Sequence, residues 1–342
     1  MKGNKRIFTI FVVLVALVLS LYYFKMSSGT FSGEVLEDFA IEDTLSIDRV
    51  EISDYMGKSI VLTKNPEDRL WRVNDEYYAK EYSVHILMKT FSDIEVKARV
   101  PEARREHVIK SIASRGTKVA IYSNGELNKT YLVGSCAQDQ KGTYMVLEHG
   151  DGTRSSEPLL MFMKKFTGCL KQRFFTKEEE WRYTGIFDYP EMEFNRVDFT
   201  HTENPEFSYS ITYDGGNDIK LFDGQGQEMP NMDTLLVKDY LLLFKKVHME
   251  TYDSYLSEFS EDSLLQTVPA FTFQVTENSG KKKKIDLYLK KPVMDYYLPD
   301  GDIAPWDMER MFGKVEGEEV GLVQTYVFNP LLKELPYFLK QE

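Results

Sequence analysis

The sequence predicts an α+β fold, in which a single N-terminal transmembrane helix precedes two related domains of mainly antiparallel sheet with packed helices. Three observations predict it: an uncharged apolar run near the start, strand and helix patterns in a fixed order, and a second occurrence of that order. Strands clustered on either side of a helical pair are typical of α+β domains. The predicted segments are a cytoplasmic basic tip (1–6), a transmembrane signal anchor (7–24), a tether (25–42), a first domain (43–182) and a second domain (183–342).

The apolar run begins with Ile7, ends with Phe24 and contains no charge, Pro or Gly. As a helix it would be about 27 Å long, close to the roughly 30 Å hydrocarbon core of a bilayer. Three positive charges precede the run and one follows it closely, so the amino terminus is expected in the cytoplasm and the bulk of the chain outside. A cleaved signal peptide, the alternative, would need a shorter apolar core and a small-residue cleavage site.

Composition and charge indicate two folded, acidic units. The chain has 342 residues and a hydrophobic fraction of 42%, which is ample for packed domains. Its net charge is −12, so nucleic acid is not an expected partner, because that would need a basic footprint. The charge is uneven: residues 183–342 hold 15 Lys and Arg against 29 Asp and Glu, whereas residues 43–182 are nearly neutral. Such asymmetry favours two separate units.

In the first domain, apolar alternation and helical spacing predict a series of strands and helices. The strongest short signal is Asn124-Gly125, a two-residue turn between two strands. The expected strands are 48–53, 58–63, 70–73, 118–123, 129–133 and 143–148, and the expected helices are 82–94, 101–116 and a short one at 159–169.

The second domain repeats this order, which predicts an internal duplication. Its expected strands are 195–200, 207–213, 218–222, 270–276, 283–289 and 320–328. Its expected helices are a long amphipathic one at 232–249, a short one at 263–268 and a closing one at 330–339.

Several motifs of the first domain are similar to those of a bacterial family catalogued as domain of unknown function 4340. They are Phe39-Ala40-Ile41-Glu42-Asp43-Thr44, Trp71-Arg72-Val73-Asn74, Ile94-Glu95-Val96-Lys97, Gly116-Thr117-Lys118-Val119, Tyr131-Leu132-Val133-Gly134 and Gly142-Thr143-Tyr144-Met145. The resemblance covers roughly residues 39–175. It implies an inner-membrane-anchored, periplasmic envelope protein, mostly from the Bacteroidetes, that has an accessory role beside transporter-type or gliding-type machinery. It carries over no catalytic residue, because the family has no established ones.

The sequence predicts no catalytic, cofactor-binding or metal site and no cofactor. The five His residues lack metal-ligand spacing: His85, His107, His149, His201 and His248. Glu148-His149-Gly150-Asp151 is interpreted as a strand end entering a turn, and Gly224-Gln225-Gly226 lacks the rest of a phosphate loop. Cys136 would need a base to act as a nucleophile. Whether it bonds to Cys169 is left open, since both could also be small buried residues.

Three other groups have a functional and a structural interpretation. Asp214, Asn217, Asp218, Asp223 and Glu228 could gather Ca²⁺, but a polar hairpin rim explains them better because their spacing departs from a calcium loop. The run 281–284 is four lysines, which could touch anionic lipid or an acidic partner but are more typical of a blunted strand edge. Some aromatics could stack on sugars or fill a partner's pocket, although core packing explains most aromatics of the chain; the candidates are Tyr77, Tyr78, Tyr296, Tyr297 and Trp306.

Three functional hypotheses follow. The first is a non-catalytic interaction protein or accessory subunit that binds an envelope protein partner. The second is an envelope hydrolase acting on glycan or lipid with acids such as Glu148 and Asp151. The third is ligand or cation binding by the acidic second domain.

Overall fold

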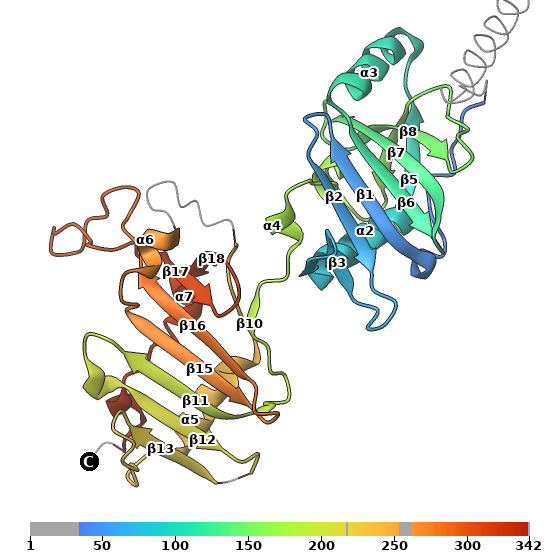
Figure 1. The fold of residues 1–342 in the computed structure, drawn as a ribbon. Helices are drawn as coiled ribbons and strands as arrows, with labels where there is room; N and C mark the ends of the chain where they lie inside the picture. The colour runs from blue at the N-terminus through green and yellow to red at the C-terminus, as the bar shows by residue number, and fades with distance from the viewer. Residues whose placement is uncertain (1–33, 217, 253–260, 341–342) are drawn as a thin grey trace, which may run out of the picture. The chain divides into compact units, whose positions relative to one another are not determined.

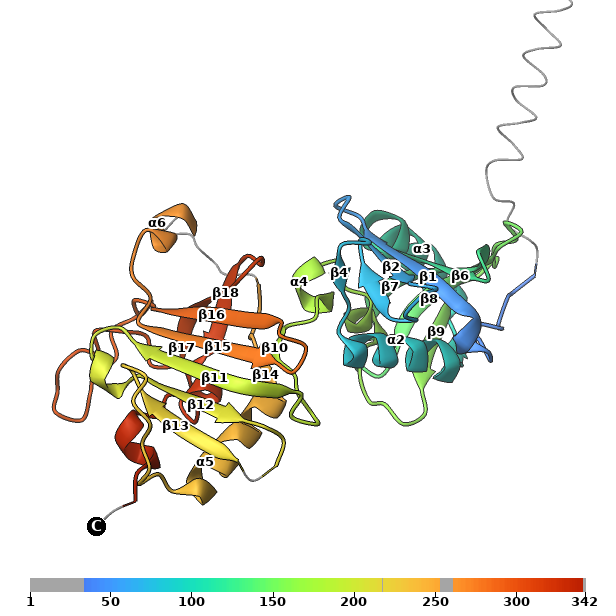
Figure 2. The same ribbon diagram turned by 60° about the horizontal axis from the view of Figure 1, so that its bottom comes forward.

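The computed structural model describes residues 34–216, 218–252 and 261–340. The chain divides into two compact units: unit 1 ends at Tyr183 and unit 2 begins at Thr184. Figures 1 and 2 show a twisted sheet in each. Among the described residues, no helix has the length and apolar character needed to cross a membrane. The predicted anchor at 7–24 lies outside these residues.

The predicted α+β class with packed helices is wrong. The part of the chain that the structure describes is mostly antiparallel sheet, arranged as sheets of nine, two and seven strands. Its α-helices are α2 (Glu81–Asp93), α3 (Glu102–Arg115), α4 (Glu178–Trp181), α5 (Thr234–Leu241), α6 (Glu261–Leu265) and α7 (Thr325–Phe328).

Three predicted helices are shortened, or replaced by a strand or a 3₁₀ turn. The run at 159–169 contains strand β9 (Leu159–Met163), because an unbroken apolar run has no period that separates a buried strand from a helix. The long helix at 232–249 ends at Leu241, and its last residues form strand β14 (Val247–His248), paired with β10 (Gly185–Phe187). The closing helix at 330–339 is a 3₁₀ turn, Leu335–Phe338, because Pro336 cannot donate a helical hydrogen bond.

The sheet of unit 1 has the order β4-β3-β2-β1-β6-β7-β8-β9-β5. The other strands are β1 (Ile47–Asp54), β2 (Ser59–Lys64), β3 (Trp71–Val73), β4 (Tyr77–Tyr78), β5 (Ile94–Arg99), β6 (Thr117–Ser123), β7 (Glu126–Cys136) and β8 (Thr143–His149). The turn at Asn124-Gly125 is confirmed: both residues have positive φ, 51° and 81°, and Ser123 pairs with Glu126 across it. Helix α2 packs on the core face of the sheet, and α3 packs on the opposite face (Figure 2).

Residues 34–41, which the sequence assigned to the tether, belong to the body of unit 1. Leu36, Phe39 and Ile41 are buried in its core. The Tyr131 hydroxyl donates a hydrogen bond to the Phe39 carbonyl. These contacts fasten the segment that leads in from the amino terminus to the sheet itself.

Cys136 and Cys169 form a disulfide bond, which settles the alternatives that the sequence left open. Their Cα atoms are 5.5 Å apart, within the ordinary range for a bridge. The bond links the end of β7 to the segment after β9. Cys136 is therefore not a free thiol, so it does not supply the nucleophile that the sequence had already disfavoured.

The main sheet of unit 2 has the order β13-β12-β11-β15-β16-β17-β18. Its strands are β11 (Phe194–His201), β12 (Tyr209–Tyr213), β13 (Ile219–Asp223), β15 (Phe271–Glu277), β16 (Lys282–Leu289), β17 (Arg310–Val315) and β18 (Val320–Gln324). This order matches β3-β2-β1-β6-β7-β8-β9 of unit 1, strand for strand. Helix α5 and a set of aromatic side chains fill the core on one face.

Candidate interaction surface

Each unit has a hollow at the same topological position, on the sheet face opposite its main core. In unit 1, α3 packs over Leu132 and Val146, which are directly opposed across β7 and β8. In unit 2, α6 packs over Tyr288 and Phe312, which are directly opposed across the corresponding strands β16 and β17. The two hollows are therefore built on equivalent strand pairs.

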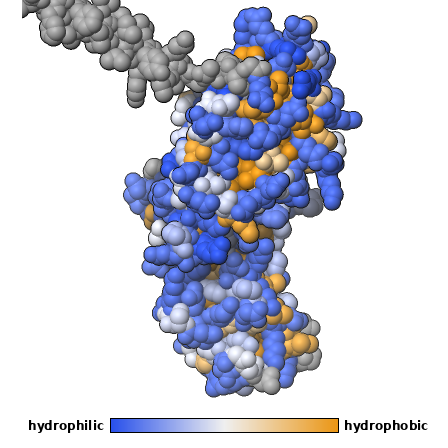
Figure 3. All heavy atoms as spheres, turned by 90° about the vertical axis from the view of Figure 1, so that its right-hand side faces the viewer, coloured by the Kyte–Doolittle hydropathy of each residue, from blue (hydrophilic) through white to orange (hydrophobic). Residues whose placement is uncertain are grey.

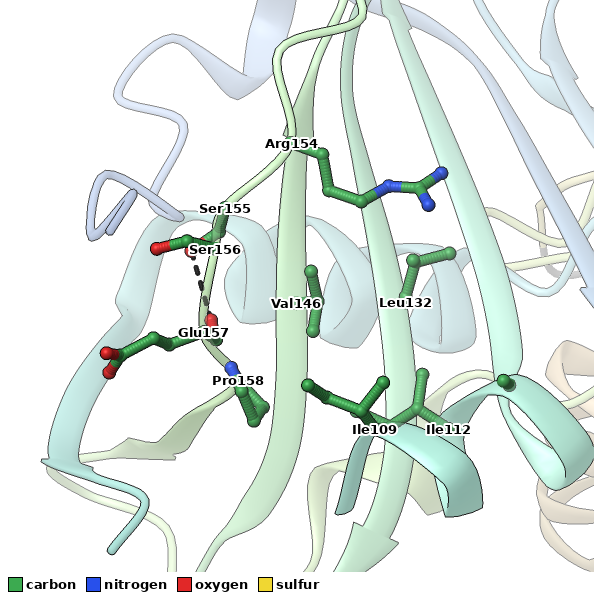
Figure 4. A pocket seen from close by; sticks show the side chains of 10 residues that line it. Ile109, Ile112, Leu132, Val146, Arg154, Ser155, Ser156, Glu157 and Pro158 are labelled. Carbon is green, nitrogen blue, oxygen red and sulfur yellow. Dashed lines mark hydrogen bonds between the residues drawn. The ribbon is translucent and has the colours of Figure 1, made fainter. Parts of the chain in front are cut away.

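The hollow of unit 1 has a volume of about 240 Å³ and a mostly apolar lining. Figure 4 shows Ile109 and Ile112 on α3, beside Leu132 and Val146 of the sheet, with Arg154 on the rim. The face of unit 1 in Figure 3 carries a gathering of hydrophobic residues amid a largely hydrophilic surface.

The charged groups around this first hollow are neutralised by partners. Arg154 Nη2 lies 2.5 Å from Glu148, and Arg105 lies 2.6 Å from Glu157. The Ser155 hydroxyl donates to the Glu157 carbonyl at 3.0 Å, across the rim (Figure 4). The first hollow therefore offers a small apolar floor with paired charges at its edge, which suits an aliphatic group better than an anion.

The hollow of unit 2 is larger, about 450 Å³. One side comes from the segment that begins with α6, and the other from residues that flank β17. Its lining residues are Thr202, Glu203, Ser263, Leu264, Thr267, Val268, Pro269, Ala270, Tyr288, Leu289, Lys291, Trp306 and Phe312. The lining is mostly apolar, and Val268 on its edge is 73% exposed.

Residues 290–309, which we call the 290–309 loop, connect β16 to β17 and project from the sheet (Figures 1 and 2). The loop exposes large apolar side chains: Val293 is 83% exposed, Met294 69% and Tyr297 72%. Ile303, Trp306 and Met308 are exposed as well. Single exposed apolar residues are ordinary, but a concentration of them on one segment marks an interaction site.

The loop has a defined backbone. Leu298 N–H donates to the Asp302 carbonyl at 2.7 Å, and Ala304 N–H donates to the Tyr296 carbonyl at 2.7 Å, which makes a small hairpin. An ion pair of 2.9 Å between Lys290 and Asp307 fastens its base. The loop therefore has a hydrogen-bonded backbone between Tyr296 and Ala304 and an ion pair at its base.

The ion pair at the base is largely buried, and it perturbs the carboxylate. Burial raises the pKa of Asp307, but the hydrogen bonds that it accepts from Lys290 and from two backbone N–H groups outweigh burial and hold that pKa below its usual value.

The aromatic residues singled out in the sequence separate into two groups. Tyr296, Tyr297 and Trp306 lie on the 290–309 loop and are at least partly exposed. Tyr77 stacks on Arg182 at 3.7 Å, and Tyr78 stacks on Arg72 at 4.1 Å. The second group is thus engaged within unit 1, whereas the first is available to a partner.

The acids of the hydrolase hypothesis do not converge. Glu148 pairs with Arg154, and Asp151 lies exposed in a turn where it accepts the Thr153 N–H at 2.8 Å. That hydrogen bond lowers the pKa of Asp151, the opposite of what a general acid needs near neutral pH. Among the described residues, every carboxylate with a perturbed pKa is lowered: Asp38, Asp54, Asp93, Asp139, Asp151 and Asp307.

The His residues and the acids of the second domain are not assembled into a site. His149 bonds to Asp38 at 3.0 Å, and His201 packs edge-on against Phe271. Asp214 and Asp223 accept backbone N–H groups in their own turns, and Asn217 lies outside the described residues. Within residues 34–216, 218–252 and 261–340, no three His, Cys, Asp or Glu side chains come together as metal ligands.

Comparison with known proteins gives no match. No family model matches the chain, no curated protein matches it, and no solved structure matches it. The resemblance to the unknown-function family therefore stays a prediction based on the motifs quoted above.

Sequence reasoning missed Val293, Met294 and Met308 as surface residues, along with Leu265 and Val268 beside α6. The available signal was an apolar set within a stretch punctuated by Pro292, Pro299 and Gly301, where turns are expected. Strand β17 was also missed, so the far end of the loop had no marker in the sequence.

Proposed function

We propose that this protein is a membrane-anchored, extracytoplasmic, non-catalytic interaction protein, an accessory subunit of a cell-envelope complex. Its binding surface is the 290–309 loop together with α6 and the hollow between them. The observation that carries the proposal is the concentration of exposed apolar side chains on a loop with a fixed backbone. Clusters of this kind bury well against a protein partner, with aromatic and Met side chains as anchors.

The proposed location has two supports. The uncharged run at 7–24 and the positive charges before it favour an anchored chain with its bulk outside the cytoplasm. The bond between Cys136 and Cys169 suits an oxidising compartment such as the periplasm. Protease added to intact spheroplasts should digest the bulk of the chain; survival of that bulk while the amino terminus is shaved would reverse the topology.

The hydrolase alternative has weaker support. Glycan or ester hydrolysis needs two acids, or a nucleophile and a base, within reach of one bond. Glu148 is neutralised by Arg154, and Asp151 accepts a hydrogen bond in an exposed turn. Cation binding by the second domain is likewise disfavoured, because its candidate acids serve separate turns.

Crosslinking in native membranes tests the proposal. The tagged full-length protein should recover a stoichiometric partner, and Met294→Ser with Tyr297→Ser should reduce that recovery at least fivefold. The matched control is Leu235→Ser, which removes an apolar side chain that is 67% exposed on α5 of the same unit. Equal recovery by the loop variant and the control would remove this surface from the interaction, and a protein that recovers no partner at all would overturn the proposal.

A further inference from the structure

We infer that the surface formed by the 290–309 loop, α6 and the hollow between them binds a basic amphipathic helix of a protein partner. This inference rests on the proposed function and names the chemistry of the partner. Three features of the surface support this partner: its apolar side chains, the charges around them, and the hydrogen-bonding state of the strands beneath.

The apolar side chains fit a helix face. The hollow of about 450 Å³ has room for more than one large side chain, and its floor includes Tyr288 and Phe312. Val268 stands at one edge, and Trp306 stands at the other as part of the loop. A helix that places apolar residues three and four positions apart would fill such a hollow and leave its opposite face in water.

The surrounding charges are acidic. The 290–309 loop holds five Asp and Glu against two Lys; Lys290 already bonds to Asp307, and Lys291 lines the hollow, so the loop keeps a net negative charge. Asp295, Asp300 and Asp302 are exposed on the loop. Glu203 lines the hollow and Asp262 is exposed on α6. Lys and Arg on the flanks of the partner helix would meet these carboxylates, and such rim charges set partner choice and association rate.

The strands beneath the surface rule out pairing by strand addition there. β16 pairs with β15 and β17, and β17 pairs with β16 and β18. Their backbone groups are already engaged, so an incoming extended peptide would find no free edge on them. A helix satisfies its own backbone and needs side-chain contacts alone.

The acidic character of the surface also argues against an anionic lipid surface as the occupant. Membrane-binding loops combine apolar tips with Lys and Arg, which attract anionic headgroups. Here the exposed carboxylates would be repelled by such headgroups. Unit 2 as a whole adds to the repulsion, since residues 183–342 carry a net charge of −14.

The test uses the full-length protein in phosphatidylcholine nanodiscs. The probe is a synthetic 18-residue helix of Leu and Lys with one apolar stripe, and its control is the same peptide with Glu in place of each Lys. The Lys peptide should bind at least tenfold more tightly than the Glu peptide in 0.1 M salt. Equal affinity for the two peptides would overturn the inference.

Charge variants locate the effect. Asp295→Asn with Asp300→Asn and Asp302→Asn should weaken Lys-peptide binding about fivefold in 0.1 M salt, and the loss should vanish in 1 M salt, where charges are screened within about 3 Å. The matched control makes the same charge change elsewhere in unit 2: Asp214→Asn with Asp218→Asn and Glu228→Gln. A control variant that loses as much affinity would overturn the assignment to the loop.

Three further outcomes separate the alternatives. Binding of protein-free phosphatidylglycerol vesicles that Met294→Ser with Tyr297→Ser abolishes would assign the surface to lipid and overturn the inference. If native crosslinking recovers a partner through the loop while the Lys peptide fails to bind, the partner's chemistry is wrong and the proposed function stands. If the loop substitutions leave the crosslinked partner unchanged, this surface is not the binding site and the inference fails, whereas a protein that recovers no partner at all overturns the proposed function.

Discussion

Units 1 and 2 arrange seven strands in the same order, yet they expose different surfaces beside the helices that pack over their hollows. In unit 1 the strands β7 and β8 are joined by residues 137–142, and α3 covers most of the opposed pair Leu132 and Val146. In unit 2 the equivalent strands are joined by residues 290–309, and the covering helix α6 is shorter. One sheet topology thus supports a smaller hollow of about 240 Å³ or a larger one of about 450 Å³, beside connections of different length, as expected when function resides in loops on a shared scaffold.

The largest effect that distinguishes the units should come from the disulfide, which belongs to unit 1. Cys136→Ser with Cys169→Ser should destabilise unit 1 by about 3–4 kcal/mol, because the bond closes a loop with a sequence separation of 33. Calorimetry should show the unit 1 transition move down while the unit 2 transition stays in place. An equal shift of both transitions would show that the units do not unfold independently.

Helix packing over the two hollows should give the next largest effect on stability. Ile112 on α3 and Leu264 on α6 are both 8% exposed. Ile112→Ala should cost about 3 kcal/mol, and Leu264→Ala about 2 kcal/mol because the wider hollow beside α6 already leaves contacts unmade. Urea denaturation of each variant measures both values. A larger loss at Leu264 would mean that the second hollow is the better packed of the two.

The base of the 290–309 loop should show a pH-dependent effect on the stability of unit 2. Asp307→Asn should destabilise unit 2 by about 2 kcal/mol at pH 7, since it removes a charged partner of Lys290. The folded pKa of Asp307 is depressed, so its contribution is present above the unfolded pKa of about 3.9 and is lost as pH falls through the folded value.

The measurement is the difference in stability between wild type and Asp307→Asn from pH 7 to pH 2. That difference should stay constant down to about pH 5 and close below the ordinary Asp value. A stability difference that persists at pH 2 would show that Asn at position 307 destabilises unit 2 through packing. The charge of Asp307 would then not stabilise the loop.

The smallest effect on stability should come from the exposed tips of the loop. Met294→Ser with Tyr297→Ser should change the unfolding free energy of unit 2 by less than about 0.5 kcal/mol, because both side chains lie in water. Thermal unfolding measures it. A loss above about 2 kcal/mol would mean that these side chains support the fold, and the comparison of the two hollows would lose its functional meaning.

Local signals in the sequence predicted much of each sheet. The alternation around β1 and β2 and the turn at Asn124-Gly125 specified strands and one register, because side-chain direction has a period of two and this turn needs two positive φ values. The predictions for the segment of β9 and for the end of α5 were wrong, because the structure of these segments depends on strands distant in sequence. β9 pairs with β5 and β8, and the segment after α5 pairs with β10.

The candidate surface was predictable in its parts and not as a whole. Tyr296, Tyr297 and Trp306 were singled out as aromatics, but their exposure depends on β17 closing a long connection, and β17 has a weak alternating pattern. The apolar floor contributed by Tyr288 and Phe312 became visible through the register of two strands. Sequence spacing alone cannot bring those elements together.

The fastening of residues 34–41 has a mechanical consequence. Phe39 and Ile41 are buried in the sheet's core, and the Tyr131 hydroxyl holds the Phe39 carbonyl from a central strand. A force applied to the chain from its amino-terminal side would therefore act directly on the core of unit 1, because the chain is packed into that core within a few residues of residue 34. Such an attachment suits a domain that must keep its orientation under tension.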